Sequence, residues 1–263
     1  MRLLPEAANG LIRLLFEPPC AACGAMLTQP LARTVCDACW AGITRVAEPY
    51  CRTCGDELTG AVALHDRCDR CRSDVHYYSV ARSAGRFDGP LREIVHAFKY
   101  GGRRLLAEPL ALLLREAGDD VLRDVEAVVP VPLHPVRLWR RGFNQADDLA
   151  RQLDQPVWRV LRRRRHGPSQ TSLPARERRR SMHHEFALSV GTLVRSEQRR
   201  RLKGATLVLI DDVMTTGATL DACAKVLAAA GAKDVRALTV ARAVSGRPHP
   251  PRVPRHPSAP RRQ

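Results

Sequence analysis

The sequence predicts an α/β protein in which a parallel sheet is flanked by helices and preceded by a small metal-binding module. After Asp74, apolar strand-like stretches alternate with helical ones, as is typical of a parallel sheet with crossover helices. Before Asp74, eight of the nine cysteines occur in four CxxC pairs, a pattern typical of zinc ribbons. Strands are expected at 78–84, 127–133, 204–210 and 235–241, and helices at 90–99, 105–117, 145–153 and 219–230.

The length and hydropathy pattern of the chain limit its class. With 263 residues, it can form one large domain, or one ordinary domain with a smaller companion. No apolar run approaches the roughly 20 residues that span a bilayer, so no transmembrane helix is expected. The N-terminal stretch is interrupted by Pro5 and Gly10 and carries two glutamates, unlike a signal peptide. We expect an amphipathic helix there, with Leu11, Leu14 and Leu15 on its apolar face, and a cytoplasmic protein.

The four CxxC pairs are separated by 12, 11 and 13 residues. A CxxC turn directs two thiolates to one point, and two such turns provide the four ligands of a tetrahedral zinc ion. Disulfides are not expected, because the cytoplasm keeps thiols reduced. We expect two structural zinc sites, since ligation by four cysteines leaves no position for water. The eight expected ligands are Cys20, Cys23, Cys36, Cys39, Cys51, Cys54, Cys68 and Cys71.

Spacing alone leaves the pairing of these turns open. Sequential pairing would produce two tandem ribbons, from residues 20–39 and 51–71, whereas interleaved pairing fits the same spacing. His65 and His76 flank the last pair and could substitute as ligands, although we expect both to be solvated. Metal binding should contribute much of the stability of so short a module. The ninth cysteine, Cys223, is expected to be a small core residue.

The formal net charge of +16 is concentrated in two segments. Residues 159–203 hold 14 Lys or Arg against three acids, and residues 242–263 hold six Arg and no acid. Such a local basic excess is typical of a site or an arm that binds a polyanion, although solvated arginine-rich loops would give the same count. The C-terminal 20 or so residues are rich in Pro and Arg without a period, and we expect them to be disordered.

The strongest chemical signal is VLIDDVMTTGATL, residues 208–220. An apolar strand ends in two carboxylates, Asp211 and Asp212, and a short turn of Thr and Gly then opens onto a helix. Amides and Thr hydroxyls at a helix N-terminus bind phosphate, and Gly217 would allow a close approach. With carboxylates near the hydroxyls of the ligand, the pattern indicates a sugar phosphate. A Walker loop and a Rossmann fingerprint are excluded by the missing Gly-Lys-Ser/Thr and GxGxxG. The alternative is a Thr-capped helix without a ligand.

This segment resembles the phosphoribosyl diphosphate (PRPP) binding motif of the type I phosphoribosyltransferases. Its place after four CxxC pairs, FKYGG (98–102), VPVPL (129–133) and RRGFNQ (140–145) is similar to the order of motifs in the ComF family. The resemblance spans about residues 18–243. It implies a double zinc ribbon at 18–74 and a type I phosphoribosyltransferase-like domain at 75–243. The residues that follow, 244–263, are the basic tail whose composition predicts disorder.

The resemblance implies roles for individual residues. Asp211 and Asp212 match the acidic pair that binds the ribose 2′- and 3′-hydroxyls. Arg140 and Arg141 follow VPVPL in the expected diphosphate loop and are candidate ligands of diphosphate or another polyanion, because guanidinium groups bind phosphate oxygens bidentately. Solvated loop arginines are the alternative for this pair. The residues that match the 5′-phosphate loop are Thr215, Thr216, Gly217, Ala218 and Thr219.

The roles of residues in two further segments stay open. Asn144 and Gln145 of RRGFNQ could cap the next helix instead of contacting a ligand. The stretch 170–186 corresponds to the mobile hood that covers the site in related enzymes. Its family-like positions are Gln170, Leu173 and Arg178, while Ser181 or Met182 stands where an Asn is usual.

The resemblance also limits the reaction. Thr215 stands where the 6-oxopurine branch has an aspartate general base, so hypoxanthine or guanine salvage is not expected. In a transfer reaction, Mg²⁺ would chelate the ribose hydroxyls and diphosphate oxygens of PRPP while diphosphate leaves the anomeric carbon. The catalytic nucleophile and the acceptor are not identified by any residue.

Two classes of function follow. The first is a phosphoribosyltransferase whose ribbons are structural or recognise the acceptor. The second is a protein of DNA uptake that handles single-stranded DNA, with PRPP as ligand or signal and other uptake proteins as partners. Steep salt dependence would indicate the second, and a scaffold that binds neither ligand is a third possibility. Aromatic residues, the platforms on which bases stack, are few: Trp40, Tyr50, Tyr77, Tyr78 and Trp139 are the candidates.

Overall fold

The computed structural model describes residues 19–28, 33–60, 65–164, 185–194 and 196–243. The expected N-terminal amphipathic helix and the basic tail at 244–263 lie outside these residues. Most of the expected hood, including all its family-like positions, also lies outside them. Within the described chain, none of the helices combines the length and apolar character that a membrane span needs.

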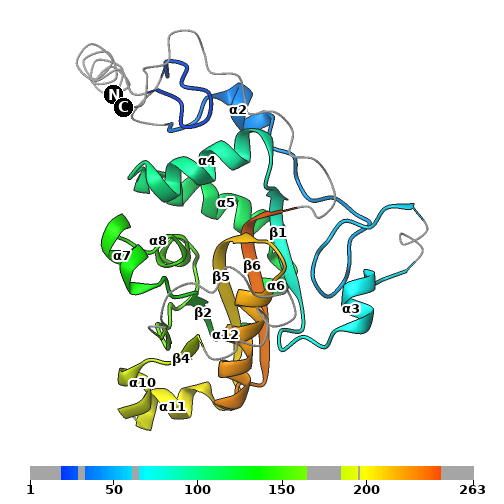
Figure 1. Ribbon diagram of the computed structural model, residues 1–263, viewed down its shortest axis with the longest axis vertical. Helices are drawn as coiled ribbons and strands as arrows, with labels where there is room; N and C mark the ends of the chain where they lie inside the picture. The colour runs from blue at the N-terminus through cyan, green and yellow to red at the C-terminus, as the bar shows by residue number, and fades with distance from the viewer. Residues whose placement is uncertain (1–18, 29–32, 61–64, 165–184, 195, 244–263) are drawn as a thin grey trace, which may run out of the picture.

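A sheet of four parallel strands forms the centre of the molecule, in the order β1-β6-β5-β2 (Figure 1). Its middle strands, β5 and β6, are buried along most of their length, as expected for strands that are covered on both faces. The predicted parallel α/β fold is therefore confirmed. The strands are β1 (Ala81–Arg86), β2 (Ala127–Pro130), β5 (Thr206–Met214) and β6 (Asp234–Arg242).

Several strand boundaries differ from the prediction, including that of β2, which ends at Pro130 and not at residue 133. β1 begins three residues later than expected, because the chain before it, including the buried Tyr78, packs on the zinc ribbon that precedes it. β5 does not end at its carboxylates but continues through them to Met214. The reason is that β6 runs beside it to the end, pairing Asp211 with Thr239 and Met214 with Arg242, whereas β2 stops opposite Ile210.

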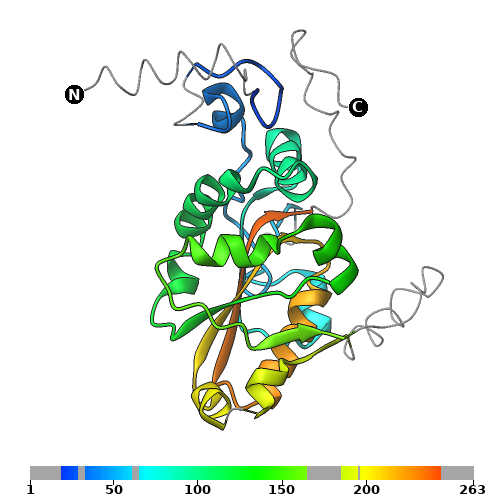
Figure 2. The same ribbon diagram turned by 90° about the vertical axis from the view of Figure 1, so that its left-hand side faces the viewer.

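Helices cover both faces of the sheet (Figure 2). Val208 and Ile210 of β5 pack with α4, α5 and α8 on one face, while Leu207 and Leu209 point to the other face, where α12 packs. This alternation along one strand produces two hydrophobic cores, one on each side of the sheet. The covering helices are α4 (Gly89–Tyr100), η2 (Arg104–Leu106), α5 (Ala107–Ala117), α8 (Gln145–Arg151) and α12 (Ala218–Ala229).

Several short elements were not predicted. The segment expected as a loop after VPVPL is a helix, α7, which begins at Pro135 after the capping residue His134 and ends at Gly142 with a φ of 74°. No residue of α7 is buried, so it has no apolar periodicity that the sequence could show. The short elements are α6 (Asp119–Leu122), α7 (Pro135–Arg141), β3 (Leu161–Arg163), β4 (Phe186–Leu188), α10 (Val190–Val194) and α11 (Ser196–Leu202).

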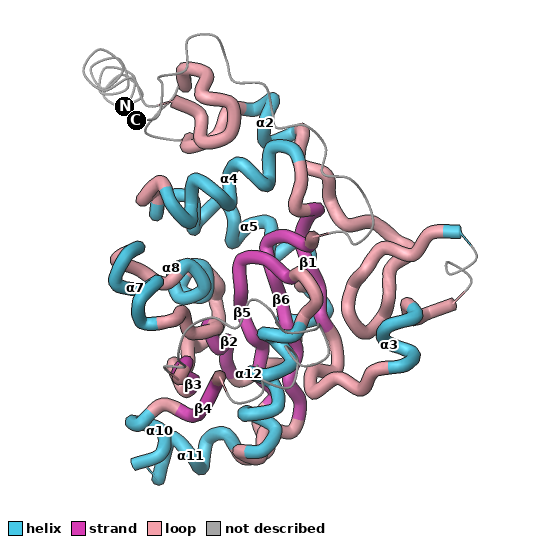
Figure 3. The backbone as a smooth tube through the Cα atoms, in the orientation of Figure 1, coloured by secondary structure: helices cyan, strands magenta, loops and turns pink. Residues whose placement is uncertain are grey.

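The cysteine-rich region forms two separate ribbons. The first ribbon, residues 19–43, contains α2 (Asp37–Ala41) and packs on α4, where Gly42 approaches Pro90. The second ribbon, residues 49–74, contains α3 (Asp69–Ser73) and lies beside β1 (Figure 3). It extends the edge of the sheet, since the amide of Ala81 donates to the carbonyl of Thr53 at 2.7 Å.

Candidate functional site

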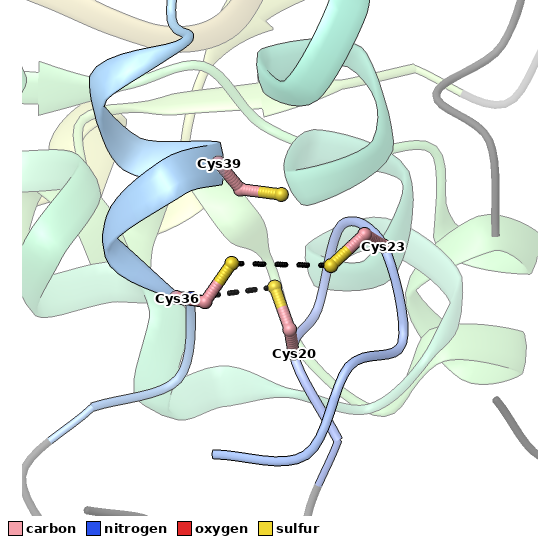
Figure 4. A group of neighbouring side chains, drawn as sticks. All are labelled: Cys20, Cys23, Cys36 and Cys39. Atoms are coloured by element: carbon pink, nitrogen blue, oxygen red, sulfur yellow. Dashed lines mark hydrogen bonds between the residues drawn. The ribbon is translucent and has the colours of Figure 1, made fainter. Parts of the chain in front are cut away.

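The eight cysteines form two tetrads in which the Sγ atoms lie within 4.8 Å of one another. The pairing is sequential, as the four cysteines of the first tetrad show in Figure 4. A tetrahedron with Zn–S bonds of about 2.3 Å has S–S edges of about 3.8 Å. The distances of 3.9 Å from Cys23 to Cys36 and of 3.7 Å from Cys54 to Cys68 fit this geometry. Both tetrads are therefore consistent with zinc sites.

Backbone amides around the first tetrad are directed at its sulfur atoms. The amide of Cys36 donates to Cys20 Sγ at 3.3 Å, and the amide of Ala25 donates to Cys23 Sγ at 3.5 Å. Such bonds stabilise thiolates, the form of cysteine that binds a metal. The arrangement is what a closed, four-cysteine structural site requires.

The two histidines near the second tetrad have different environments. His65 is exposed, as expected. The expectation that His76 is solvated was wrong: its side chain is only 10% exposed, and its Nε2 lies 3.4 Å from Cys71 Sγ. Because four cysteines already complete this tetrad, His76 contacts the ligand Cys71 and is not itself needed as a metal ligand.

The segment after β5 has the form of a phosphate-binding turn. Thr215, Thr216 and Gly217 make the bend, with both threonines exposed, and Ala218 and Thr219 form the first turn of α12. Gly217 is buried with a φ of 80°, and a Cβ there would lie 2.7 Å from Met214 Cε and 3.0 Å from the hydroxyl of Tyr78. Only glycine fits this position, so the turn brings backbone amides to the helix N-terminus without a side chain in between.

The two carboxylates are held just before this turn. Asp212 is buried and its Oδ1 lies 2.7 Å from the ammonium group of Lys99, while Asp211 Oδ1 accepts a hydrogen bond from the amide of Asp212 at 2.8 Å. Lys99 belongs to the FKYGG motif at the end of α4. The sequence gives no local sign of a role for this lysine, because only the fold brings it to Asp212 of β5.

Asp211 has a strongly perturbed acidity. Burial raises its pKa to about 7, with the charge of Asp212 as the second cause, and the nearby cations of Lys99 and Arg163 oppose the rise. An aspartate that titrates near neutral pH is a common feature of binding and catalytic sites. A ligand that donates hydroxyl hydrogen bonds, or brings a cation, would favour its charged form.

Replacement of Lys99 by methionine is expected to raise the pKa of Asp211 further, because it removes a cation that favours the carboxylate. The Lys99→Arg variant keeps the charge and should leave this pKa close to the wild-type value. Carbon-13 NMR titration of the aspartate carboxyl groups measures both. A midpoint that is the same or lower in Lys99→Met would contradict the proposed electrostatic role.

The two candidate arginines differ in their environments. Arg141 stacks on the ring of Tyr100 at 4.6 Å and donates to the Tyr100 hydroxyl and to Gln145 Oε1. Arg140 is exposed and makes no hydrogen bond or ion pair with the rest of the described chain. Asn144 caps α8 by accepting from the amide of Ala146, the role left open in the sequence analysis.

The aromatic candidates for base stacking differ in how exposed their side chains are. Tyr78 is only 2% exposed and cannot reach a base, so that expectation was wrong. Trp139 of α7 is 85% exposed, and Arg137 and Arg140 of the same helix are also exposed. Cys223 is fully buried in α12, as expected for a core residue.

Known family models match both the cysteine-rich region and the α/β region of the chain. The family model of the phosphoribosyl transferase domain matches residues 138–256, and that of the double zinc ribbon domain matches residues 11–72. Among solved structures, the allosteric regulatory enzyme of purine biosynthesis aligns with 16% identity and a TM-score of 0.36, covering 55% of this chain and 30% of that one.

Relatives cover most of the chain. Competence protein F of Haemophilus influenzae (strain ATCC 51907 / DSM 11121 / KW20 / Rd) is 34% identical over 205 residues, which are 74% of this chain and 85% of that protein. DNA utilization protein YhgH of Escherichia coli (strain K12) is 30% identical over 215 residues, covering 77% and 87%. With a double zinc ribbon before a phosphoribosyltransferase-type domain and these relatives, the chain belongs to the ComF family of competence proteins.

Proposed function

We propose that this protein binds PRPP together with Mg²⁺ at the end of β5 and transfers the phosphoribosyl group to an acceptor. The observation that carries the proposal is the joining of β5 to α12, in which two adjacent carboxylates are followed by a glycine-containing turn at a helix N-terminus. This lies at the carboxyl edge of a parallel sheet, where ligands of open α/β folds bind.

Each residue of the site would have a distinct task. Asp211 and Asp212 would accept hydrogen bonds from the ribose hydroxyls, with Lys99 holding Asp212 in place through their ion pair. The amides of residues 215–219 and the hydroxyls of the exposed threonines would bind the 5′-phosphate. Arg140, which has no other partner within the described chain, would bind the diphosphate, and Arg141 would be held by Tyr100 and Gln145.

The reaction would break the bond between the anomeric carbon and diphosphate. Mg²⁺ supplies charge neutralisation for the diphosphate oxygens as they leave. The carboxylates would hold the ribose in place, and Arg140 would stabilise the negative charge that develops on the leaving group. Residues 75–243 would form this catalytic domain, with the ribbon module at 18–74 as its structural support and 244–263 as a basic tail. A cytoplasmic location suits the tetrads, whose cysteines must stay reduced to bind metal.

Titration calorimetry of the zinc-loaded protein with PRPP, with and without Mg²⁺, tests the proposal. We expect Mg²⁺-dependent binding in about the micromolar range, and weaker binding of ribose 5-phosphate, which lacks the diphosphate. Bound protein can then be offered acceptors while diphosphate release is followed. If folded protein does not bind PRPP in either condition, the proposal is wrong.

A second candidate function is the handling of single-stranded DNA, and one observation favours it. Helix α7 carries the exposed Trp139, and the exposed side chains of Arg137 and Arg140 on the same helix have no hydrogen-bond or ion-pair partner within the described chain. Exposed aromatic and basic side chains on one short element are the components with which proteins bind single-stranded nucleic acid. The names of two relatives, a competence protein and a DNA utilization protein, agree with it.

Replacement of Trp139 by alanine is then expected to weaken binding of a fluorescent thymidine oligonucleotide about tenfold, as measured by anisotropy, because one stacking contact is worth about 1–3 kcal/mol. The Val194→Ala variant, at a similarly exposed apolar position on α10, should bind like wild type. Equal affinities for wild type and Trp139→Ala, or no dependence on salt, would rule out α7 as the DNA surface.

A further inference from the structure

The two ribbons pack on opposite sides of the central sheet, and they differ in whether they share a core with the helix that follows residues 215–217. Buried residues of the first ribbon, such as Cys20 and Cys39, share a core with α4, α5 and α8. Buried residues of the second ribbon, such as Cys54 and Cys71, share the opposite core with α12 and Met214. Figure 1 shows the corresponding positions, with the first ribbon above α4 and the second beside β1. Among the described residues of the two ribbons, only those of the second therefore pack on the side of the sheet that carries α12.

His76 connects the second tetrad to the first turn of α12. Its Nε2 lies 3.4 Å from Cys71 Sγ, and its Nδ1 lies 3.7 Å from Asp221 Oδ1. Asp221 also accepts a hydrogen bond from the amide of Tyr77 at 2.6 Å, and its own amide donates to the carbonyl of Gly217 at 2.9 Å. A chain of contacts thus runs from a metal ligand to the bend that would bind phosphate.

Tyr78 makes a second connection. Its ring stacks on His76 with centroids 4.9 Å apart and an interplanar angle of 16°. Its buried hydroxyl has no hydrogen-bond partner among the described residues and lies 3.0 Å from the position that a Cβ of Gly217 would occupy. The tyrosine therefore fills the space directly behind the bend.

Arg242, at the end of β6, makes a third connection. Its buried guanidinium donates to the carbonyl of Cys54 at 2.7 Å and lies 3.5 Å from Cys54 Sγ and 3.1 Å from Met214 Sδ. Met214 is the last residue before the bend and contacts Gly217. The guanidinium thus joins the second tetrad to the strand end from which the bend starts.

We propose that the second tetrad, loaded with zinc, positions the 215–219 segment for its phosphate ligand, with His76 as the positioning residue, and that the first tetrad has no such role. Four thiolates around Zn²⁺ carry a net negative charge, which favours hydrogen bonds from His76 and from Arg242. Without metal, so small a ribbon loses its fold. The connections through His76, Tyr78 and Arg242 then lose their contacts with the second ribbon. The inference extends the proposed PRPP site and rests on it.

Two cysteine variants separate the tetrads. Cys68→Ser disrupts the second tetrad and Cys36→Ser the first, and both positions are partly buried ligands. Each variant should lose one of two zinc ions by elemental analysis. In Cys68→Ser alone, we expect amide hydrogen exchange at residues 215–221 to become about tenfold faster or more, and the affinity for PRPP with Mg²⁺ to fall by a similar factor.

A milder variant covers the case in which Cys68→Ser does not fold. His76→Phe keeps a ring against Tyr78 but loses the contacts with Cys71 and Asp221. It should retain both zinc ions, exchange faster at residues 215–221, and bind PRPP several-fold more weakly. Unchanged exchange in His76→Phe, or equal exchange in the two cysteine variants, overturns the inference. Hydrogen exchange needs no ligand, so it decides the matter even if wild type binds no PRPP, a result that would refute only the proposed function.

Discussion

Replacement of both Asp211 and Asp212 by asparagine is expected to weaken binding of PRPP with Mg²⁺ about a hundredfold or more. Hydrogen bonds to charged groups contribute about 1.5–3 kcal/mol each. The variant replaces both of the carboxylates that would accept hydrogen bonds from the ribose hydroxyls. Titration calorimetry at pH 8 measures the loss, since Asp211, whose pKa is about 7, is then mostly charged in wild type.

The substitution of Asp211 in this variant should not weaken the fold. The pKa of Asp211 is raised in the folded chain, so its charged form opposes folding, and this cost develops as the pH rises from the ordinary value of 3.8 toward about 7. A neutral amide avoids that cost. The matched control is Asp119→Asn with Asp120→Asn, an adjacent exposed acidic pair on α6, which should bind like wild type. Equal loss in both double variants, or retention of affinity in the first, would show that the carboxylates of β5 do not bind the ribose.

Replacement of Arg242 by methionine is expected to lower the free energy of unfolding by about 3–5 kcal/mol, the range for breaking a buried ion pair from one side. The guanidinium is 2% exposed and pairs with Asp56 at 2.8 Å, while it also donates to the carbonyl of Cys54. Methionine fills the volume but leaves both acceptors without this donor, and it removes the positive charge beside the second tetrad. Urea unfolding of zinc-loaded protein measures the change.

The control for this prediction is Arg201→Met. Arg201 pairs with Glu197 four residues earlier on α11, and both side chains are largely exposed, so the loss should stay within about 0.5 kcal/mol. If Arg242→Met were as stable as Arg201→Met, the contact between the second ribbon and the end of β6 would contribute little to the fold.

The parts of the structure that the sequence could predict are those specified by local pattern. Two CxxC turns a dozen residues apart can converge on one metal ion, so the cysteine spacing predicted two four-cysteine sites. It left the choice between sequential and interleaved pairing to the structure. The apolar β5, its glycine turn and α12 also follow one another directly in the chain, and this is why the candidate phosphate segment was visible. The resemblance to ComF then added the expected ligand.

The remaining features depend on contacts between distant residues. Lys99 reaches Asp212 only because α4 packs against the sheet that contains β5. Arg242 reaches Cys54 although 188 positions separate them in the sequence. His76 appeared to be a solvated neighbour of the last CxxC pair, since the chain gives no local sign of Asp221 beside it. Helix α7 escaped prediction for another reason: it buries no residue, so its sequence carries no helical periodicity.

The proposed PRPP site lies at the end of β5 and the start of α12. A crystal structure of the zinc-loaded protein with PRPP and Mg²⁺ tests it most directly. We predict the 5′-phosphate on the amides of residues 215–219, and the ribose hydroxyls within hydrogen-bond distance of Asp211 and Asp212. Ligand density at another surface, with this segment empty at saturating PRPP, would contradict this placement.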